Sequence, residues 1–312
     1  MNTKVIDVRG LVKRYGDFLA VDQLDLTVAK GEVVGLLGPN GAGKTTTILM
    51  LLGLTEPSAG FVRILGKDPL RHPLELKREV GYLPDSVGFY ESMTGVENLS
   101  YIARLNNMPR AEDYRRIGAA MGRFKLSAVA HQPVSTYSRG MRQRLGLAEL
   151  LMRECSVAIL DEPTSGLDPQ STQELLESIQ TLSKDGITIL LSSHMLGAVQ
   201  SVCHRIALFG KGRIGFIGTV EELAARIGSS MVTIEVDAKG VDLVRVFNSI
   251  DGVSTMIQKP DGGWQVEATH DIRLELSRLI FEAGGCLRTL ALGNVTLEQA
   301  YRRYFAGGSR AV

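Results

Sequence analysis

The stretch that decides the fold is Gly38-Pro39-Asn40-Gly41-Ala42-Gly43-Lys44-Thr45. It matches the pattern G-x-x-x-x-G-K-[ST] at every defined position. A β-rich apolar run, Val33–Leu37, precedes it, and the pattern of Thr45–Leu52 predicts a helix directly after it. Because strand, glycine-rich turn and helix are the context in which this motif binds phosphate, we favour a nucleoside triphosphate site over an accidental glycine-rich turn.

Each residue type in this turn has a physical role. Glycines let successive backbone N–H groups face phosphate oxygens at the positive end of the following helix. Lys44 can reach the β- and γ-phosphates, and the Thr45 hydroxyl can coordinate Mg²⁺. We expect nucleotide contacts from the whole turn and the next residue, namely Gly38, Pro39, Asn40, Gly41, Ala42, Gly43, Lys44, Thr45 and Thr46.

A second apolar run, Val157–Leu160, ends in two adjacent carboxylates, Asp161 and Glu162. Neighbouring strand residues point to opposite faces, so the two acids are expected to do different work. Asp161 is placed to hold Mg²⁺ through its water shell, and Glu162 to polarise the attacking water. The alternative is that both acids only cap a helix beginning after Pro163. The phosphate-binding turn upstream makes the catalytic interpretation the stronger one.

Short apolar runs alternate with amphipathic stretches over the first two-thirds of the chain, which indicates an α/β fold with a mostly parallel sheet. A third run, Thr188–Ser192, ends near His194. Ligands of such sheets bind at the carboxyl ends of strands, where all three polar clusters lie. We expect an ATPase domain over residues 1–228, with a helical subdomain at about 86–150.

The remaining residues, 229–312, are expected to form a small α+β accessory domain. Their pattern predicts strand, helix, a hairpin, helix, strand and a last helix, which matches the ferredoxin-like plan. The predicted segments are Met231–Val236, Val241–Ile250, Val253–Gln258 with Trp264–Ala268 across Pro260-Asp261-Gly262-Gly263, Ile272–Ala283, Leu287–Leu292 and Leu297–Phe305. We expect this domain to serve packing or dimerisation, with a small-ligand site as the alternative.

Composition narrows the range of partners. The formal net charge is +1, which argues against a nucleic-acid-binding surface. Apolar stretches fall short of the roughly 18 residues that span a bilayer, so a membrane role requires a partner chain. Cys155, Cys203 and Cys286 show no paired spacing. We expect buried thiols in a reducing compartment, neither disulfides nor a metal site.

Further motifs identify the chain as a member of the ABC ATPases. A segment beginning Tyr137-Ser138-Arg139-Gly140-Met141 resembles the family's signature sequence, usually Leu-Ser-Gly-Gly-Gln. Asp161-Glu162-Pro163-Thr164-Ser165-Gly166-Leu167-Asp168 is similar to its acid strand and D-loop. Ser192-Ser193-His194 resembles its switch histidine, and Arg14-Tyr15-Gly16 its adenine-stacking loop. The likeness covers roughly residues 5–223, with every motif in the family's order.

The resemblance implies roles that spacing alone does not supply. Tyr15 would stack on adenine, and His194 would hydrogen-bond the γ-phosphate and help to orient the water. Ser138 and Gly140 would contact the γ-phosphate of a nucleotide held by a second protomer. The implied active unit is a head-to-tail homodimer that encloses two ATP molecules, with Asp168 at the seam. ATP and Mg²⁺ are the implied substrate and cofactor.

Two departures from the family pattern stand out. Arg139 and Met141 replace a glycine and a glutamine of the signature, while its serine and second glycine remain. Asp85, in Gly81-Tyr82-Leu83-Pro84-Asp85, stands where the family usually has glutamine, which senses Mg²⁺ and the attacking water. Aspartate is shorter, so we expect Asp85 to approach the metal through a bridging water or a loop movement.

Several phrases resemble the ABC-2-type branch, whose members power exporters and membrane-enzyme maturation systems. The phrases are Tyr82-Leu83-Pro84, Phe89-Tyr90, Thr94-Gly95-x-Glu97-Asn98-Leu99 and Tyr137-Ser138-x-Gly140-Met141. Residues 81–90 and 297–305 are also similar to the maturation ATPase of the copper enzyme nitrous oxide reductase. Drug, polysaccharide and peptide exporters share much of this likeness, so the cargo stays open.

The branch implies a polytopic permease partner and a place on the cytoplasmic face of the cell membrane, through that permease. The competing class is a soluble ABC ATPase that acts on ribosomes or DNA. Such translation factors usually carry two ATPase domains, and such DNA-repair members insert long coiled coils between the phosphate-binding turn and the signature. This sequence shows one set of ATPase motifs, and an ordinary helical stretch separates Lys44 from Ser138. Both observations favour the transporter class.

Overall fold

The computed structural model describes residues 3–195, 197, 200–227, 232–259, 262–293 and 301. The chain forms two compact units, Met1–Thr219 and Val220–Val312. The domain boundary expected near residue 228 lies after helix α8 (Val220–Ile227), which groups with the second unit here. That boundary stays a proposal.

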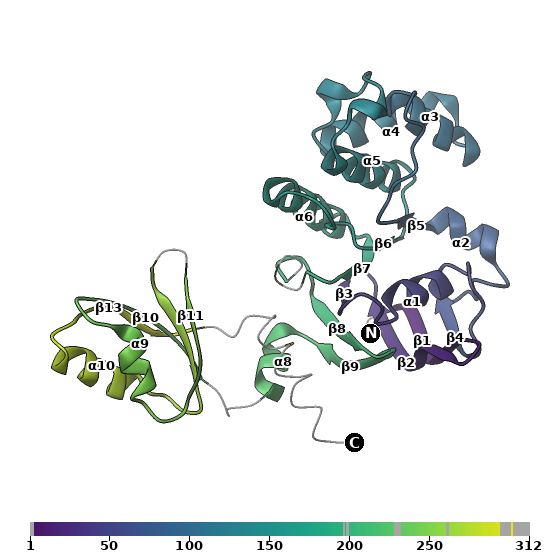
Figure 1. The fold of residues 1–312 in the computed structure, drawn as a ribbon. Helices are drawn as coiled ribbons and strands as arrows, with labels where there is room; N and C mark the ends of the chain where they lie inside the picture. Colours follow the sequence, from purple (N-terminus) through teal and green to yellow (C-terminus); the bar gives the residue numbers. More distant parts are fainter. Residues whose placement is uncertain are drawn as a thin grey trace. The chain divides into compact units, whose positions relative to one another are not determined.

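The first unit is built around a six-stranded sheet with the order β5-β6-β7-β3-β8-β9 (Figure 1). All strands but β9 run parallel. The strands are β3 (Val33–Leu37), β5 (Val80–Leu83), β6 (Val157–Leu160), β7 (Thr188–Ser193), β8 (Arg205–Gly210) and β9 (Arg213–Gly218). Every residue of β3, β6 and β7 is buried, which explains why their sequences are continuous apolar runs without alternation. The mostly parallel sheet expected from the sequence is confirmed.

A smaller antiparallel sheet lies beside it and was not expected from the sequence. Its strands are β1 (Lys4–Tyr15), β2 (Phe18–Ala29) and β4 (Ala59–Ile64), in the order β2-β1-β4. One hydrophobic core joins the two sheets and helix α1 (Lys44–Leu51), and it includes Ile6, Leu26, Leu36, Ile48 and Phe209. The core therefore fixes the start of α1, where the phosphate-binding turn ends.

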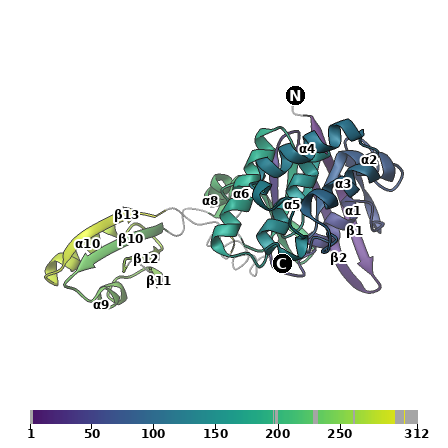
Figure 2. The same ribbon diagram turned by 90° about the horizontal axis from the view of Figure 1, so that it is seen from above.

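Helices α3 (Gly95–Leu105), α4 (Arg110–Arg123) and α5 (Arg139–Met152) lie together in both views (Figures 1 and 2). They occupy the stretch that we propose as a helical subdomain. A reciprocal pair of hydrogen bonds between Thr94 and Glu97 fixes the start of α3. Two further helices are α2 (Pro73–Glu79) and α6 (Pro169–Lys184), and two short 3₁₀ turns span Ser127–Val129 and Val134–Thr136.

The second unit contains a four-stranded antiparallel sheet with the order β11-β12-β10-β13. Its elements are β10 (Val232–Lys239), α9 (Leu243–Asn248), β11 (Val253–Gln258), β12 (Trp264–Ala268), α10 (Arg273–Glu282) and β13 (Cys286–Leu292). Phe247 of α9 and Leu276 of α10 share one core with Ile234 and Val266 of the sheet. Element order and strand order confirm the ferredoxin-like plan. The hairpin residues 260 and 261 and, apart from Tyr301, the predicted helix 297–305 lie outside the described residues.

The cysteine prediction was wrong at one position. Cys155 is buried and Cys203 is partly buried, but Cys286 is exposed. It begins β13, an edge strand whose residues are exposed almost throughout, so its thiol faces solvent. None of the helices that the structure describes has the length and apolar character required to cross a membrane.

Candidate active site

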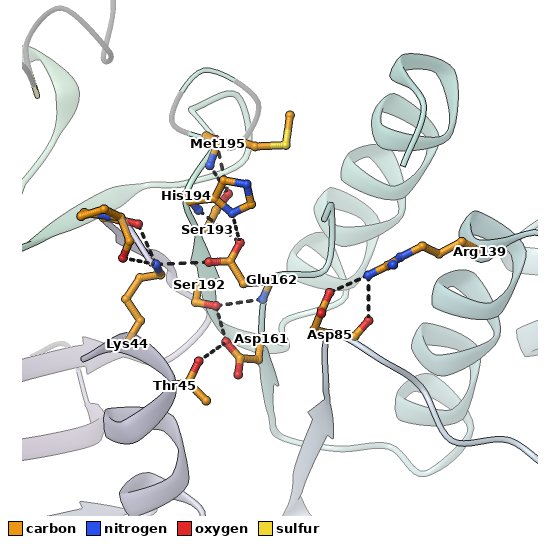
Figure 3. Close-up of polar contacts among 12 residues, drawn as sticks. Lys44, Thr45, Asp85, Arg139, Asp161, Glu162, Ser192, Ser193, His194 and Met195 are labelled. Atoms are coloured by element: carbon orange, nitrogen blue, oxygen red, sulfur yellow. Dashed lines mark hydrogen bonds and ion pairs between the residues drawn. The ribbon is translucent and has the colours of Figure 1, made fainter. Parts of the chain in front are cut away.

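Four neighbouring parallel strands deliver the predicted site residues to one edge of the sheet. The strands β5, β6, β7 and β3 are adjacent in that order. Asp85 follows β5, Asp161 follows β6, His194 follows β7 and Gly38 follows β3. Parallel strands present their carboxyl ends at the same edge, so residues far apart in the sequence come together there (Figure 3).

Lys44, at the start of α1, is 5% exposed and its ammonium group is fully engaged. Its Nζ donates to the carbonyl oxygens of Gly38 at 2.6 Å and Pro39 at 3.1 Å, and lies 3.2 Å from Oε1 of Glu162. These contacts offset the cost of burying a charge. They also hold a cation within the phosphate-binding turn, close to the carboxylate proposed to act on water.

Packing requires glycine at two positions of the turn. A Cβ on Gly38 would come within 2.5 Å of the Phe209 carbonyl oxygen. A Cβ on Gly43, whose φ is 106°, would come within 2.6 Å of the Ala20 carbonyl oxygen. The turn is thus pressed against β8 and β2, which sets its shape before any nucleotide binds.

The Asp161 carboxylate is buried and hydrogen-bonded on one oxygen. Its Oδ1 accepts from the Ser192 hydroxyl at 2.6 Å and from the Thr45 hydroxyl at 3.4 Å. Ser192 Oγ in turn accepts from the backbone N–H of Glu162 at 2.8 Å. Sequence reasoning missed Ser192 as a site residue. The available signal was a hydroxyl at the end of a buried strand, next to the predicted switch histidine.

This hydroxyl and carboxylate fit Mg²⁺. Mg²⁺ prefers oxygen ligands and usually keeps several waters, binding to one or two protein groups and to substrate phosphates. Within the described ranges no three His, Cys, Asp or Glu side chains gather into a metal-binding group. The Thr45 hydroxyl and the Asp161 carboxylate, 3.4 Å apart, are a small oxygen set of this kind.

The Glu162 carboxylate lies between two cationic or potentially cationic partners. Its Oε2 accepts from the backbone N–H of His194 at 3.2 Å and lies 2.7 Å from His194 Nδ1. Its Oε1 faces Lys44. Glu162 also has a φ of 48°, a conformation that costs about 1–3 kcal/mol for a non-glycine residue and is concentrated at functional sites. The backbone strain and both contacts fix the direction of this carboxylate.

Five predicted residues lie outside this cluster: Tyr15, Ser138, Gly140, Asp168 and Asp85. Tyr15 ends β1 with its side chain 49% exposed, and the Lys13 ammonium lies 4.8 Å from its ring centroid. Ser138 caps α5 by accepting from the Met141 N–H at 3.2 Å, and Gly140 packs where a Cβ would meet Ser171 at 2.9 Å.

Asp168 caps α6. It accepts from the Ser171 hydroxyl at 2.6 Å and the Ser171 N–H at 2.9 Å. These two hydrogen bonds lower the pKa of the Asp168 carboxyl. Gly140 of α5 and Asp168 of α6 thus meet at Ser171, and Ser138 caps the same end of α5.

The Asp85 carboxylate contacts α5 and is not hydrogen-bonded to the Thr45–Asp161 pair. Its Oδ1 accepts from Arg139 Nη2 at 2.7 Å, and its backbone oxygen accepts from Gln143 Nε2 at 2.9 Å (Figure 3). The predicted approach of Asp85 to the metal stays a prediction. Sequence reasoning singled out both Asp85 and Arg139 as departures from the family pattern but did not foresee that they meet.

Comparison with known proteins settles the family. The model of the ABC transporter family matches residues 21–165. An ABC transporter ATP-binding protein of Bacillus subtilis, YhaQ, is 31% identical over 95% of this chain and 97% of its own length. The chain belongs to the ABC transporter ATP-binding proteins. The daunorubicin/doxorubicin resistance ATP-binding protein DrrA of Streptomyces peucetius is 34% identical over 96% of this chain and 92% of its own length.

Solved structures agree with this assignment. A chain described as the ATP-binding subunit of an ABC transporter superimposes with a TM-score of 0.65 at 31% identity, covering 71% of this chain and 92% of its own. The cbiO1 subunit of Clostridium perfringens gives a TM-score of 0.67 at 27% identity. The resemblance to ABC-2-type ATP-binding subunits is confirmed, and with it an ABC ATPase that binds and hydrolyses ATP.

Proposed function

We propose that this ABC ATPase powers an exporter of the ABC-2 type as a head-to-tail homodimer, bound to the cytoplasmic face of the membrane through a polytopic permease. The observation that carries the proposal is the likeness to DrrA over 96% of the chain, which includes the second unit as well as the ATPase. A likeness limited to the ATPase would describe only how ATP is hydrolysed. The name of that relative supports export of a small molecule, and the cargo stays open.

The group around Lys44 supports a division of labour in hydrolysis. Lys44 would neutralise charge on the transferred phosphoryl group, and Thr45 and Asp161 would hold Mg²⁺ with the phosphates. Bound there, the metal would stabilise the charge that develops on the transferred phosphoryl group. Glu162 would accept the proton of the attacking water, with His194 directing the carboxylate through its 2.7 Å contact. Lys44 and His194 both contact Glu162 in this structure. When nucleotide binds, each would exchange its contact with Glu162 for a contact with phosphate or water.

The second group supports the dimer. Ser138, Gly140 and Asp168 lie at the starts of α5 and α6, where backbone N–H groups and the helix dipoles favour an anion. Ser138 bonds within α5, Asp168 bonds to Ser171 of α6, and Gly140 packs against the same Ser171. On this proposal one chain would supply two separate half-sites, one at this place and one around Lys44. A head-to-tail pair would complete both half-sites around ATP, with Tyr15 stacked on the adenine.

The permease is expected to dock on the surface contributed by residues 85–105. Tyr90 and Tyr101 are 54% and 40% exposed and pack edge to face with ring centroids 5.3 Å apart, and Leu105 is 65% exposed. A photo-cross-linking residue at Tyr101, in cells that also express a candidate polytopic permease, is expected to capture that permease. Phe18, which is 63% exposed on β2, is the matched control position.

Two outcomes of this experiment would count against the proposal. Equal capture from Phe18 would show that the cross-link reports exposure and not docking. Capture from Tyr101 of ribosomal or DNA-associated proteins alone would favour the competing class, a soluble ABC ATPase acting on ribosomes or DNA.

A further inference from the structure

Two of the three positions at which this chain departs from its family's motifs, Asp85 and Arg139, contact each other. Arg139, in the signature segment, donates from Nη2 to Asp85 Oδ1 at 2.7 Å, and the same nitrogen lies 3.4 Å from the Asp85 backbone oxygen. The two residues are 54 positions apart in sequence. The two substituted residues thus form an ion pair that links the loop after β5 to the start of α5.

The ion pair with Arg139 orients the Asp85 side chain, whereas another contact holds the backbone of the loop after β5. Gln143, which is 1% exposed, already holds the Asp85 backbone oxygen at 2.9 Å. The Arg139 and Asp85 side chains are 45% and 53% exposed, and ion pairs so open to water contribute little to stability. Loss of Arg139 should therefore free the Asp85 carboxylate while the loop backbone stays in place.

The freed carboxylate would lie close to the proposed metal site. Strands β5 and β6 pair in parallel, and the Asp161 N–H donates to the Leu83 oxygen at 2.8 Å, two residues before Asp85. Burial and then the charges of Asp161 and Asp85 raise the pKa of Tyr82, so both carboxylates act on this residue of β5. Figure 3 shows Asp85 between Asp161 and Arg139, with its contacts directed to Arg139.

Arg139 is itself held from a second side. A Cβ on Gly166, whose φ is +66°, would come within 3.1 Å of Arg139 Nη1 and 3.2 Å of Cζ. The guanidinium therefore packs over the loop that leads to Asp168, in space that a larger residue would fill. Gly166 thus lies on one side of the Arg139 guanidinium and Asp85 on the other.

We propose that Arg139 is a positioning residue that holds the Asp85 carboxylate against α5 and away from a divalent cation at Thr45 and Asp161. The inference rests on the proposed function, because it requires a metal–nucleotide complex at that site. In this proposal the Asp85 carboxylate reaches the metal region only when its ion pair with Arg139 breaks.

The test is a titration of Mn²⁺ into the full chain with a non-hydrolysable ATP analogue, followed by electron paramagnetic resonance. Arg139→Gln is expected to bind Mn²⁺ at least about threefold more tightly than wild type, because outer-shell groups alter metal affinity by tenfold or more where they act fully. The same substitution in an Asp85→Asn background is expected to give no such gain, since the carboxylate is gone.

A matched control separates position from charge. Arg142→Gln removes an equal charge from the same helix, where Arg142 pairs with Glu91 at 3.2 Å, and it should leave Mn²⁺ affinity unchanged. Unchanged affinity in Arg139→Gln, or an equal gain in the Asp85→Asn background, would overturn the positioning role.

Failure of the proposed function has a different outcome. A wild-type chain that bound no Mn²⁺ with the analogue would remove the metal–nucleotide site and this inference together. A wild-type chain that hydrolyses Mg-ATP and binds Mn²⁺, but whose affinity does not respond to Arg139→Gln, would leave the ATPase standing and remove only the restraint on Asp85.

Discussion

Replacing Lys44 with alanine is expected to lower ATP hydrolysis by at least about a hundredfold, the scale of removing one preorganised electrostatic contact from a transition state. The Lys44 ammonium is 5% exposed and is held by two carbonyl oxygens of the phosphate-binding turn. No solvent reorganisation is then needed when charge develops on the phosphoryl group. Steady-state phosphate release by the purified chain with Mg-ATP measures the effect.

Lys125→Ala is the control for this substitution. Lys125 is 71% exposed and its only ion pair in the described part of the chain, to Glu177, is at 4.0 Å, so its loss should leave turnover unchanged. A circular dichroism melt should show that Lys44→Ala remains folded. Near wild-type turnover of a folded Lys44→Ala chain would refute the assignment of the phosphate-binding turn.

Replacing Glu162 with glutamine is expected to slow hydrolysis by about a hundredfold or more, since general bases contribute roughly 10²–10⁴ in rate. The amide keeps the shape of the side chain but cannot accept the proton of water. Nucleotide binding should persist, and a nucleotide-bridged dimer should accumulate because its opening follows hydrolysis. Sedimentation velocity with and without Mg-ATP would measure this dimer.

Sedimentation of Glu162→Gln without nucleotide is the control for this experiment. Without nucleotide, Glu162→Gln should sediment as wild type does, which shows that the substitution alone does not associate the chains. A Glu162→Gln chain that binds ATP but stays monomeric would contradict either the shared site or the role of Glu162. Wild-type turnover in this variant would contradict the role of Glu162 directly.

The linear motifs were sufficient to propose the ATPase part of the site because the residues of each motif are contiguous. Gly38 to Thr45 are contiguous, and a strand before them and a helix after them are enough to predict a phosphate-binding turn. Asp161 and Glu162 are likewise placed by the strand that delivers them. The alternating pattern of the second unit was sufficient for its strand and helix order, which the sheet topology confirms.

Contacts between distant segments decided the rest. The sequence alone determined the strand, turn and helix around Gly38 to Thr45, the strand that ends at Asp161 and Glu162, and the ferredoxin-like order. Only the tertiary structure brought Ser192 to Asp161, His194 to Glu162 and Arg139 to Asp85, across 31, 32 and 54 positions. The physical reason is that periodicity encodes which face of an element is buried, whereas a hydrogen bond between loops depends on how whole elements pack. Parallel strands bring loops to one edge, and side-chain lengths at that edge then select the partners.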